Sequence, residues 1–584
     1  MATPTLKPKL HGRMFYESIG SPKYVLAPMV DQSEFAWRLL TRSFLPPDLR
    51  SSILAYTPMF HAKLFAESPK YRNAHFEALK EDGEKYLDGN EEFDRPLFVQ
   101  FCANDPEHLL GGAKQVQQYC DAVDLNLGCP QGIAKRGHYG AFLQEDWGTI
   151  HKLIRTLHEN LDVPVTAKMR ILETKERTLE YAKMILDAGA SIITVHGRQR
   201  EQKGHYTGLA DWAVLRYLRE NLPPETVIFA NGNVLQHADI GECLEATKVD
   251  GVMSAEGNLY DPSIFAAPSL GKEASREYWC GRDGKGGYRA DAVLRRYMDI
   301  IHKFVMHQDP PQRLPLFLPG DSPAVQVVSD PVAADRQSEE PMTKKRKLDE
   351  GSAELNGVED NAMSKKPKAN EANLSSNEPA SAVLTKKQKR KQQAKEKHQQ
   401  QPTREKVTNA NLIAMQAHCF HMLRSLVSKH HEVRDALAHC KAGDIDAYEN
   451  VLTLTEAAVK EGLLAYGADP LAFEERSDLT AVADIDSTES SLEAVRRCKR
   501  PYWVCQPYVR PLPKEALEKG SVQLSKKQLR KMEEEKIGVE KAGVSPGGKV
   551  GVVEEEVRRE VLSVEDGVAD AAAAVVPKEG MVCG

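Results

Sequence analysis

The chain has 584 residues, which is too long for one ordinary domain, so we expect either about four domains or one large domain with smaller ones. Hydrophobic residues make up 41% and charged residues 28% of the chain, enough for a sizeable core, but 33 prolines and several lysine-rich runs exclude one compact globule. The formal charge is -6, from 78 basic and 84 acidic side chains, so only local patches can attract nucleic acid.

Residues 24–265 alternate short apolar runs with amphipathic segments of helical period, such as residues 178–188 before Gly189. This alternation predicts parallel strands joined by helices, and the nearly continuous apolarity of the runs suits strands covered on both faces. Eight strands are expected, at residues 24–28, 52–56, 97–101, 122–126, 164–169, 191–196, 226–231 and 250–254. Eight such units predict the α/β class and a closed (β/α)8 TIM barrel.

Two amphipathic helices are expected after the barrel, at residues 292–305 and 411–427, and we expect them to pack together. The stretch between them is rich in Pro, Ser, Asn, Gln and Lys and cannot bury enough surface to fold. The predicted parts are an N-terminal extension (1–20), the barrel (21–275), a split all-α domain (276–305 and 406–470), a disordered basic insert (306–405) and a mostly disordered low-complexity tail (471–584). Residues 498–511 of the tail concentrate aromatic side chains, which we expect to pack onto another part of the chain.

Polar side chains stand at the carboxyl ends of the expected strands, which is the end that carries the reactive groups of such barrels. In chain order these ends present Gln100, Asn126 followed by Cys129, Lys168, His196 with Arg198, Asn231-Gly232-Asn233 and Ala255-Glu256-Gly257. One lysine or histidine beside a strand is ordinarily structural. So many polar strand ends in succession, with glycines after the last two, indicate a phosphate-bearing ligand across the barrel mouth. A flavin fits best, because Lys168 offers positive charge where a reduced flavin is anionic.

Several long motifs in order resemble the tRNA-dihydrouridine synthases. They are APMVDQSEFAWR (27–38), DLNLGCPQGIAKRGHYGAFL (124–143), TAKMRI (166–171), TVHGR (194–198), ANGNV (230–234) and SAEGNLYDP (254–262). The wording is most similar to the eukaryotic class that acts on positions 16 and 17 of tRNA. The resemblance covers about residues 20–305, resumes at about 408–465 and touches CQPYVRP at 505–511. The insert of about 100 residues is where this chain departs from the compact family pattern.

The resemblance implies an oxidoreductase that binds FMN and uses NADPH to reduce the 5,6 double bond of uridine in the D-loop of tRNA. Pro28 and Met29 are implied to lie beside the flavin ring and Gln100 to hydrogen-bond it. The full implied cofactor set is Ala27, Pro28, Met29, Gln100, Lys168, His196, Asn231, Gly232, Asn233, Ala255 and Glu256, of which the last five belong to the phosphate-binding segments. The catalytic acid of the family corresponds to Cys129.

The reaction explains why a cysteine suits this position. The pyrimidine ring receives a hydride at C6 from flavin N5 and a proton at C5 from the opposite side. An ordinary thiol, with a pKa near 8.5, is mostly protonated at neutral pH and can donate that proton. Cys102, Cys120 and Cys243 lack the flanking motif of Cys129 and are interpreted as core cysteines.

The target base is stacked or paired in folded tRNA, so pulling it out costs a few kcal/mol that other contacts with the RNA must supply. The candidates for such contacts are Asn126, Lys135, Arg136, Arg170 and Arg198, although each alone is more often a solvated polar or charged group. Phosphate contacts of this kind predict affinity that weakens as salt rises.

A basic run in the insert, Lys344, Lys345, Arg346 and Lys347, resembles a nuclear import signal read by an import receptor, with RNA attraction or simple solubility as alternatives. We expect the protein to be located in the nucleus, the cytoplasm or both, and we expect it to be a monomer. The first residues, MATPTLKPKLHGR, lack the apolar core of a secretory signal, and no stretch approaches the roughly 18 to 20 apolar residues that cross a bilayer. No membrane and no metal are expected, and the ten cysteines are expected to be reduced thiols.

Two other functions fit part of this pattern. An FMN-dependent oxidoreductase acting on free pyrimidines, of the orotate type, also pairs FMN with strand-end lysines, but it gives no reason for an added helical domain. An RNA-binding scaffold that has lost catalysis keeps the barrel, but Cys129, Lys168, His196 and Asn231 speak against it. Yellow colour of the purified protein separates the scaffold from both enzymes.

Overall fold

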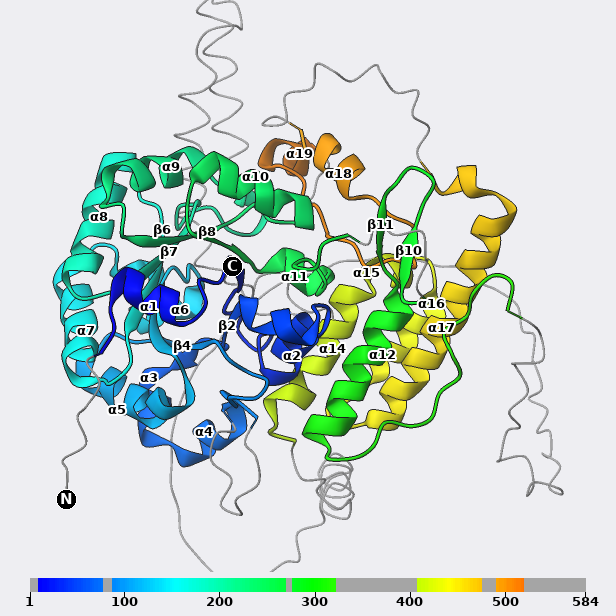
Figure 1. Ribbon diagram of the computed structural model, residues 1–584, viewed down its shortest axis with the longest axis horizontal. Coiled ribbons are helices and arrows are strands. Elements are labelled where there is room, and N and C mark those ends of the chain that lie inside the picture. The colour runs from blue at the N-terminus through cyan, green and yellow to red at the C-terminus, as the bar shows by residue number, and fades with distance from the viewer. Residues whose placement is uncertain (1–8, 77–86, 269–275, 322–406, 475–489, 519–584) are drawn as a thin grey trace, which may run out of the picture. The chain divides into compact units, whose positions relative to one another are not determined.

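The computed structural model describes residues 9–76, 87–268, 276–321, 407–474 and 490–518 (Figure 1). The basic run at 344–347 and most of the insert expected at 306–405 lie outside the described residues. Part of the expected low-complexity tail is described: residues 490–518 contain α18 (Leu492–Cys498), α19 (Pro513–Glu518) and the connection between them. This part of the tail therefore takes part in the fold.

Eight parallel strands close into a barrel: β1 (Tyr24–Leu26), β2 (Ile53–Tyr56), β4 (Leu97–Cys102), β5 (Ala122–Leu127), β6 (Val165–Arg170), β7 (Ile192–His196), β8 (Val227–Asn231) and β9 (Gly251–Ser254). The ring closes where β1 pairs with β9, with Leu26 opposite Ser254. A short strand, β3 (Phe60–His61), adds to the carboxyl end of β4. The expected barrel is confirmed, and each expected strand lies within two residues of the observed one, because buried strands need nearly continuous apolarity.

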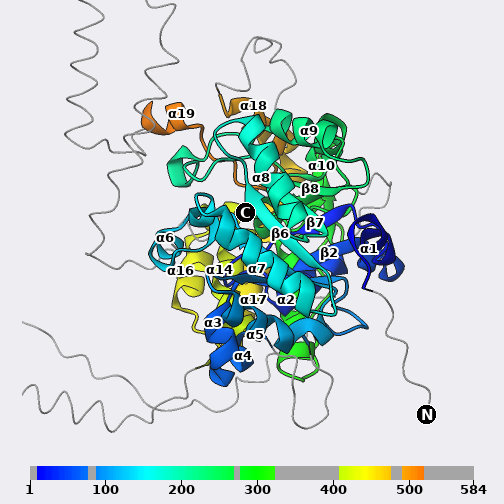
Figure 2. The ribbon, with the colours of Figure 1, turned by 90° about the vertical axis from the view of Figure 1, so that its left-hand side faces the viewer.

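Helices surround the barrel on the outside, and α7 and α8 lie over β6 and β7 (Figure 2). The helix α7 begins where Asp146 accepts a hydrogen bond from the backbone N of Thr149, and its apolar residues recur every three or four positions on the buried face. The helices of this layer are α2 (Phe35–Ser43), α3 (Ala62–Glu67), α4 (Pro69–His75), α5 (Pro106–Val116), α6 (Gly132–Gly137), α7 (Trp147–Asn160), α8 (Lys175–Asp187), α9 (Trp212–Asn221), α10 (His237–Thr247) and α11 (Glu256–Tyr260).

The amino end of the barrel is covered by α1 (Gly12–Ser18), within the predicted N-terminal extension. Phe15 and Tyr16 are buried, and Phe15 stacks on Phe98 of β4. The hydroxyl of Tyr16 donates to the backbone oxygens of Pro22 and Asp250, just before β1 and β9. Because α1 covers the amino end, a ligand has to bind at the opposite, carboxyl end of the barrel.

The helical domain follows a hairpin of β10 (Tyr278–Cys280) and β11 (Gly286–Tyr288). It contains α12 (Ala290–Ile300), a π-helical turn η5 (Ile301–Val305), α14 (Ala410–Met422), α15 (Arg424–Val427), α16 (His431–His439) and α17 (Ile445–Ala468). The two expected helices correspond to α12 with its π turn and to α14 with α15, and their expected packing is confirmed because α12 and α14 are in contact. Apolar side chains of these helices continue the hydrophobic core of the barrel.

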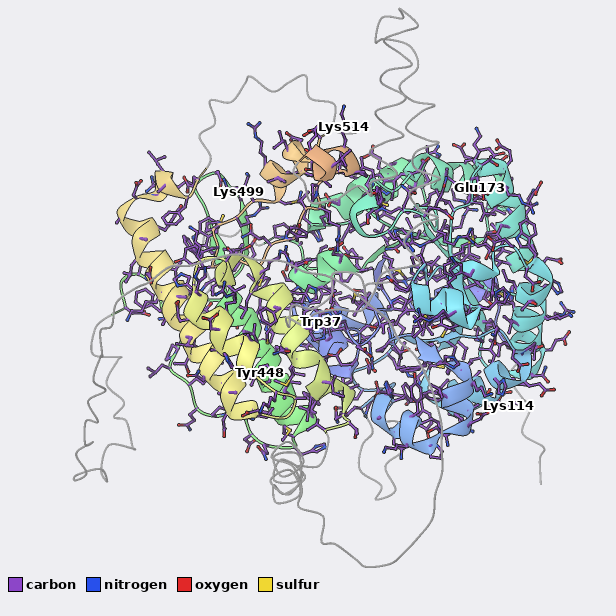
Figure 3. All side chains as sticks on the ribbon, turned by 180° about the vertical axis from the view of Figure 1, so that it is seen from behind. Trp37, Lys114, Glu173, Tyr448, Lys499 and Lys514 are labelled. Atoms are coloured by element: carbon purple, nitrogen blue, oxygen red, sulfur yellow. The ribbon has the colours of Figure 1, made fainter. Side chains whose placement is uncertain are left out.

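One buried contact joins α14 of the helical domain to α2 of the barrel. His418 lies with Nε2 at 3.0 Å from both carboxylate oxygens of Glu34, and its ring stacks on Trp37 at a centroid distance of 3.9 Å. Figure 3 shows Trp37 at the boundary between the barrel helices and the helical domain. Nearby, the backbone N of Ala36 donates to Oδ1 of Asn411. The helical domain is thus held to the barrel by specific polar contacts as well as by its apolar face.

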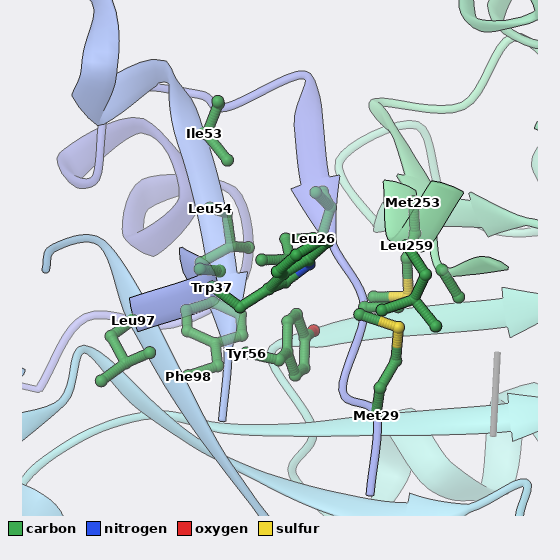
Figure 4. Packing of buried hydrophobic residues seen from close by; sticks show 14 of the residues in the cluster. Leu26, Met29, Trp37, Ile53, Leu54, Tyr56, Leu97, Phe98, Met253 and Leu259 are labelled. Carbon is green, nitrogen blue, oxygen red and sulfur yellow. The ribbon is translucent and has the colours of Figure 1, made fainter. Parts of the chain in front are cut away.

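The core also includes the mouth of the barrel. Met29, Met253 and Leu259 meet where β1, β9 and α11 come together (Figure 4). Trp37, Leu54 and Tyr56 form a neighbouring part of the same cluster. The loops that carry the expected site residues therefore stand on a closely packed base.

We expect His418→Ala to lower the free energy of unfolding by about 3 to 5 kcal/mol, because it leaves the carboxylate of Glu34 buried without this partner and removes the stacking on Trp37. Urea unfolding measures the change. The matched control is Glu159→Ala, which breaks the exposed pair between Arg155 and Glu159 and should cost no more than about 0.5 kcal/mol. An equal loss of unfolding free energy in the two variants would show that the buried contact stabilises the fold no more than the exposed ion pair does.

Candidate active site at the carboxyl end of the barrel

The predicted site residues of five consecutive strands, β4 to β8, come together at the carboxyl end of the barrel. Strand pairing places Asn126 of β5 opposite Lys168 of β6, and His196 of β7 opposite Asn231 of β8. Gln100 of β4 lies opposite Asp124 of β5, one step deeper in the barrel. All of these side chains are at least nine-tenths buried, so the mouth is lined by polar groups that are shielded from bulk water.

The turn after β1 is fixed against the end of β9. The backbone N of Ala27 donates to the carbonyl of Ser254, and the backbone N of Met29 donates to the hydroxyl of Ser33. Ala27, Pro28 and Met29 are buried. They present an apolar surface at the mouth, as a flavin ring requires, and their predicted contact with the ring stays a prediction.

A relay of hydrogen bonds runs from the barrel interior to the loop of Cys129. Nε2 of Gln100 donates to Asp124 at 2.8 Å, and Nδ2 of Asn126 donates to Oε1 of Gln100 at 2.9 Å. Oδ1 of Asn126 then accepts the backbone N–H groups of Gly128 and Cys129. Gln100 was predicted to contact the cofactor and Asn126 the RNA, and both predictions remain open. What the structure adds is that both amides also position the loop of Cys129.

Asp124 is the inner end of this relay. Burial raises the pKa of Asp124 to about 6, against the hydrogen bonds from Thr166 and Gln100, which lower it. The hydroxyl of Thr166 donates to Oδ1 at 2.6 Å, so donors reach both carboxylate oxygens. The positive charge of Lys168 acts in the same direction as these hydrogen bonds. The hydrogen bonds and the charge of Lys168 therefore offset part of the free-energy cost of burying the Asp124 carboxylate in an otherwise apolar barrel.

Cys129 lies in a closed apolar environment, with 1% of its surface exposed. It belongs to a small cluster with Cys102, Ala134 and Tyr139. Its carbonyl accepts from the backbone N of Ala141, next to Gly140, where φ is +65° and a Cβ atom would come within 2.8 Å of that carbonyl oxygen. The segment after Cys129 therefore folds back toward it, and Ala134 and Tyr139 of this segment pack in the same buried cluster as the thiol.

A cavity of about 630 Å³ opens beside His196 and Asn231. The predicted phosphate segments, 231–233 and 255–256, line it together with Arg170 and Arg198. Among the described residues, neither Nδ1 of His196 nor Oδ1 of Asn231 has a hydrogen-bond partner, although both atoms are buried. Buried polar atoms without partners are costly, so these two indicate a polar ligand.

The protonation of His196 follows from its neighbours. Burial, followed by the positive charges of Arg170 and Arg198, holds the pKa of His196 well below its ordinary value, so the ring is neutral at neutral pH. Nη1 of Arg198 lies 3.0 Å from Nε2 of His196, and an arginine can only donate, so Nε2 accepts. The hydrogen of the neutral ring is then on Nδ1, where it can be donated to a ligand.

Two residues after β8 shape the floor of the cavity. Gly232 has φ of +113°, and a Cβ atom there would come within 2.6 Å of Ala210, so no other residue fits without movement. The side chain of Asn233 is committed to the protein: its oxygen accepts from Ala210 N and Arg198, and its nitrogen donates to the carbonyl of Ala210. The cradle is thus preformed. Its unpartnered buried atoms, positive charge and close backbone approach fit the phosphate end of FMN.

The predicted RNA contacts fall into two groups. Lys135 and Arg136 are exposed on α6, directly after the Cys129 loop, next to Ile133, which is 59% exposed. Asn126 and Arg170 are buried, and Arg198 is only partly accessible. Arg170 donates to the carbonyls of Gly128 and Gln199 and thereby supports the loop from below.

Other residues of the site were not identified from the sequence. Asp124 and Thr166 were included in strands and in the motifs at 124–143 and 166–171 but were given no role, although a carboxylate inside an apolar run signals an unusual buried group. Tyr508 and Arg510 also line the cavity, and they come from the aromatic segment 498–511. Their proximity to the mouth has no signal in the local sequence.

Two searches of the described residues gave negative findings. No three His, Cys, Asp or Glu side chains in this part of the chain lie together as a set that could hold a metal ion. Within the same residues, no helix is long and apolar enough to cross a membrane.

Comparisons with known proteins give a consistent result. The family model described as dihydrouridine synthase (Dus) matches residues 25–306. The tRNA-dihydrouridine(16/17) synthase (NAD(P)(+)) of Saccharomyces cerevisiae is 56% identical over 300 residues, which are 51% of this chain and 65% of that protein. The corresponding protein of Schizosaccharomyces pombe is 52% identical over 52% of this chain and 69% of its own length. A mouse protein named as like these synthases is 48% identical over 45% of this chain and 52% of its own length. The matched region thus spans from about half to about two thirds of the relatives.

The raised pKa of Asp124 predicts a pH-dependent contribution to stability. A carboxyl with a pKa of about 6 in the fold and about 3.9 in the unfolded chain stabilises the fold most below pH 4, and this contribution is lost as the pH rises through 6. Asp124→Asn cannot ionise. The free energy of unfolding of the wild type minus that of Asp124→Asn should therefore fall, by on the order of 2 kcal/mol, between pH 4 and pH 7.

Urea unfolding at several pH values checks this. Asp187→Asn is the control, because the Asp187 side chain is 85% exposed and its substitution should give a nearly flat difference. A difference for Asp124→Asn that does not change with pH would contradict the burial of an ionisable group.

Proposed function

This chain belongs to the dihydrouridine synthase family, and we propose that it reduces the 5,6 double bond of uridine in tRNA. The names of its relatives specify positions 16 and 17 and the cofactor NAD(P)(+), and we extend both to this chain, with NADPH as the reductant. We further propose that the flavin is FMN, bound by the residues predicted for it. The observation that carries the proposal is that one mouth holds both the Cys129 loop and the cavity with the unpartnered atoms of His196 and Asn231.

Different side chains and backbone groups are proposed to hold different parts of the cofactor. The preformed cradle at Gly232 and the cationic side chains of Arg170 and Arg198 suit the phosphate. Nδ1–H of His196 and Oδ1 of Asn231 are a donor and an acceptor for other polar atoms of the ligand. When bound, reduced FMN supplies the hydride that the reaction needs.

The proton is assigned to Sγ of Cys129, which donates it to C5 of the uridine. Asn126 holds the backbone N–H groups of Gly128 and Cys129, and Arg170 holds the carbonyl of Gly128. The carbonyl of Cys129 accepts from the backbone N of Ala141, so the loop is held before and after Cys129. Because the thiol is covered by the segment 132–144, binding of the RNA must displace part of that segment. The covered state keeps water and small molecules away from the thiol between turnovers.

RNA binding is proposed for the exposed outer surface of the same segment. Lys135 and Arg136 on α6 carry positive charge next to the Cys129 loop, where contacts with RNA phosphates would bring the target base to the mouth. Contacts by α6 also couple RNA binding to movement of the segment that covers the thiol. Location in the nucleus or cytoplasm, recognition by an import receptor at 344–347 and a monomeric state remain proposals based on the sequence.

We expect Cys129→Ala to keep the yellow colour of bound FMN and to lower turnover by about a hundredfold or more, because a positioned general acid contributes 10²–10⁴ in rate. Turnover is measured as NADPH oxidation and as dihydrouridine formed in unmodified tRNA, detected by mass spectrometry. The control is Cys243→Ala, since Cys243 is buried in α10 and does not line the cavity.

Cys243→Ala should retain wild-type turnover. Wild-type turnover in Cys129→Ala would refute the acid role of this cysteine. Turnover by the wild-type protein on free uracil or orotate without tRNA would instead favour a free-pyrimidine oxidoreductase.

A further inference from the structure

The C-terminal segment, defined here as residues 490–518, forms one wall of the cavity at the barrel mouth. On the barrel side the cavity is lined by the phosphate segments at 231–233 and 255–256, and on the opposite side by Ser491, Tyr508 and Arg510. In Figure 1, α19 lies near the right-hand end of α10 and α18 lies farther to the right, and Arg497 of α18 contacts α10. A part of the chain that follows the barrel by more than two hundred residues therefore completes the site.

The segment is held at this position by contacts with the rest of the fold. Trp503 is fully buried and packs edge-on against Trp279 and Phe473, and its carbonyl accepts from the backbone N of Ala290. Arg497 of α18 forms ion pairs with Asp239 and Glu242 of α10. Packing and ion pairs at residues that precede Arg510 thus hold the segment against the barrel and the helical domain.

Hydrogen bonds within the C-terminal segment hold the two ends of the connection between α18 and α19 together. Glu515 accepts hydrogen bonds from the backbone N of Ser491 and of Leu512 and from the hydroxyl of Ser490. Burial acts to raise the pKa of Glu515, but the hydroxyl of Ser491 and these hydrogen bonds outweigh it and lower the pKa to about 2. This closure gives residues 508–512 a defined path along the cavity wall.

Arg510 is oriented by a carboxylate at the rim. Its Nε lies 3.0 Å from both carboxylate oxygens of Glu256, and Nη2 lies 2.8 Å from Oε1. Glu256 is the first residue of α11, directly after Ala255. A guanidinium has five N–H donors in a planar fork, so it can bind a carboxylate along one edge and a phosphate with its remaining donors.

The cavity carries excess positive charge. Its lining contains five cationic side chains and three carboxylates: Arg170, Arg198, Lys203, Arg497 and Arg510 against Glu242, Glu256 and Glu493. Arg198 donates to Gly208, Asn233 and His196, none of which is an anion. Burial, followed by the charge of Arg170, lowers the pKa of Arg198 to about 10, and the opposing charge of Glu256 does not offset this. A dianionic phosphate group matches this imbalance.

We propose that Arg510 of the C-terminal segment is a ligand of the cofactor phosphate, and that the segment closes the phosphate end of the cavity. The proposal rests on the proposed function, since it requires that the cavity binds FMN. Glu256 acts as a positioning residue that presents the guanidinium to the cavity. The isoalloxazine end of the cofactor, beside Met29 and Lys168, makes no use of Arg510.

The test compares FMN with riboflavin, which has the same ring and ribityl chain but no phosphate. Full-length apoprotein is titrated with each, and binding is followed by quenching of flavin fluorescence. Arg510→Gln should weaken FMN binding by about tenfold or more, as expected for a lost hydrogen bond to a charged group, and should leave riboflavin binding within about twofold. Arg510→Lys should recover part of the FMN affinity, because it restores the charge without the planar fork.

The matched control is Arg500→Gln on the same segment. Arg500 donates to the backbone carbonyls of Gly286 and Arg497 and does not line the cavity, so both affinities should stay at wild-type values. Equal weakening of FMN and riboflavin by Arg510→Gln would show that the arginine only holds the segment in place, and unchanged FMN affinity would show that it does not contact the phosphate. Either result overturns the proposal while the proposed function stands. A wild-type protein that binds neither flavin overturns both.

Discussion

A carboxylate inside an apolar barrel is unfavourable unless hydrogen bonds surround it, and at Asp124 those hydrogen bonds continue to the loop of Cys129. Gln100 and Thr166 donate to the carboxylate, which orients the amide of Gln100 to accept from Asn126. Asn126 in turn holds the backbone at Cys129. Hydrogen bonds that start in the middle of the strands therefore position the proposed acid. Because the relay is fully buried, losing any one partner would leave a buried polar group without a hydrogen bond.

The site combines rigidity with a need for movement. The cradle after β8 is fixed by the backbone at Gly232 and by the committed side chain of Asn233, and it does not have to change when a phosphate binds. The thiol of Cys129, in contrast, is covered by residues that follow it in the chain. These covering residues include the exposed, basic α6. The structure thus places a preformed cradle beside a thiol that is buried.

Segments far apart in the chain are brought to this one end. His418 attaches the helical domain to α2 through Glu34 and Trp37, close to the turn that follows β1. Trp503 anchors the C-terminal segment on the hairpin and helices of the same domain, and Arg510 then reaches Glu256. The helical domain therefore has a second role besides any contact with RNA, because it carries the segment that walls the cavity.

The local sequence was sufficient to predict the barrel and most of the residues at its mouth. Apolar runs of strand length predicted all eight strands, and a parallel barrel brings every carboxyl end to one rim, so Lys168, His196 and Asn231 had to lie close together. The motif around Cys129 likewise pointed to its chemistry. Only the tertiary structure showed that Asn126 and Gln100 bond to each other, that the thiol is covered, and that Arg510 meets Glu256, a residue 254 positions away. Hydrogen-bond partners and burial depend on distances between side chains that are remote in the chain, and periodicity and motif spacing contain no information about those distances.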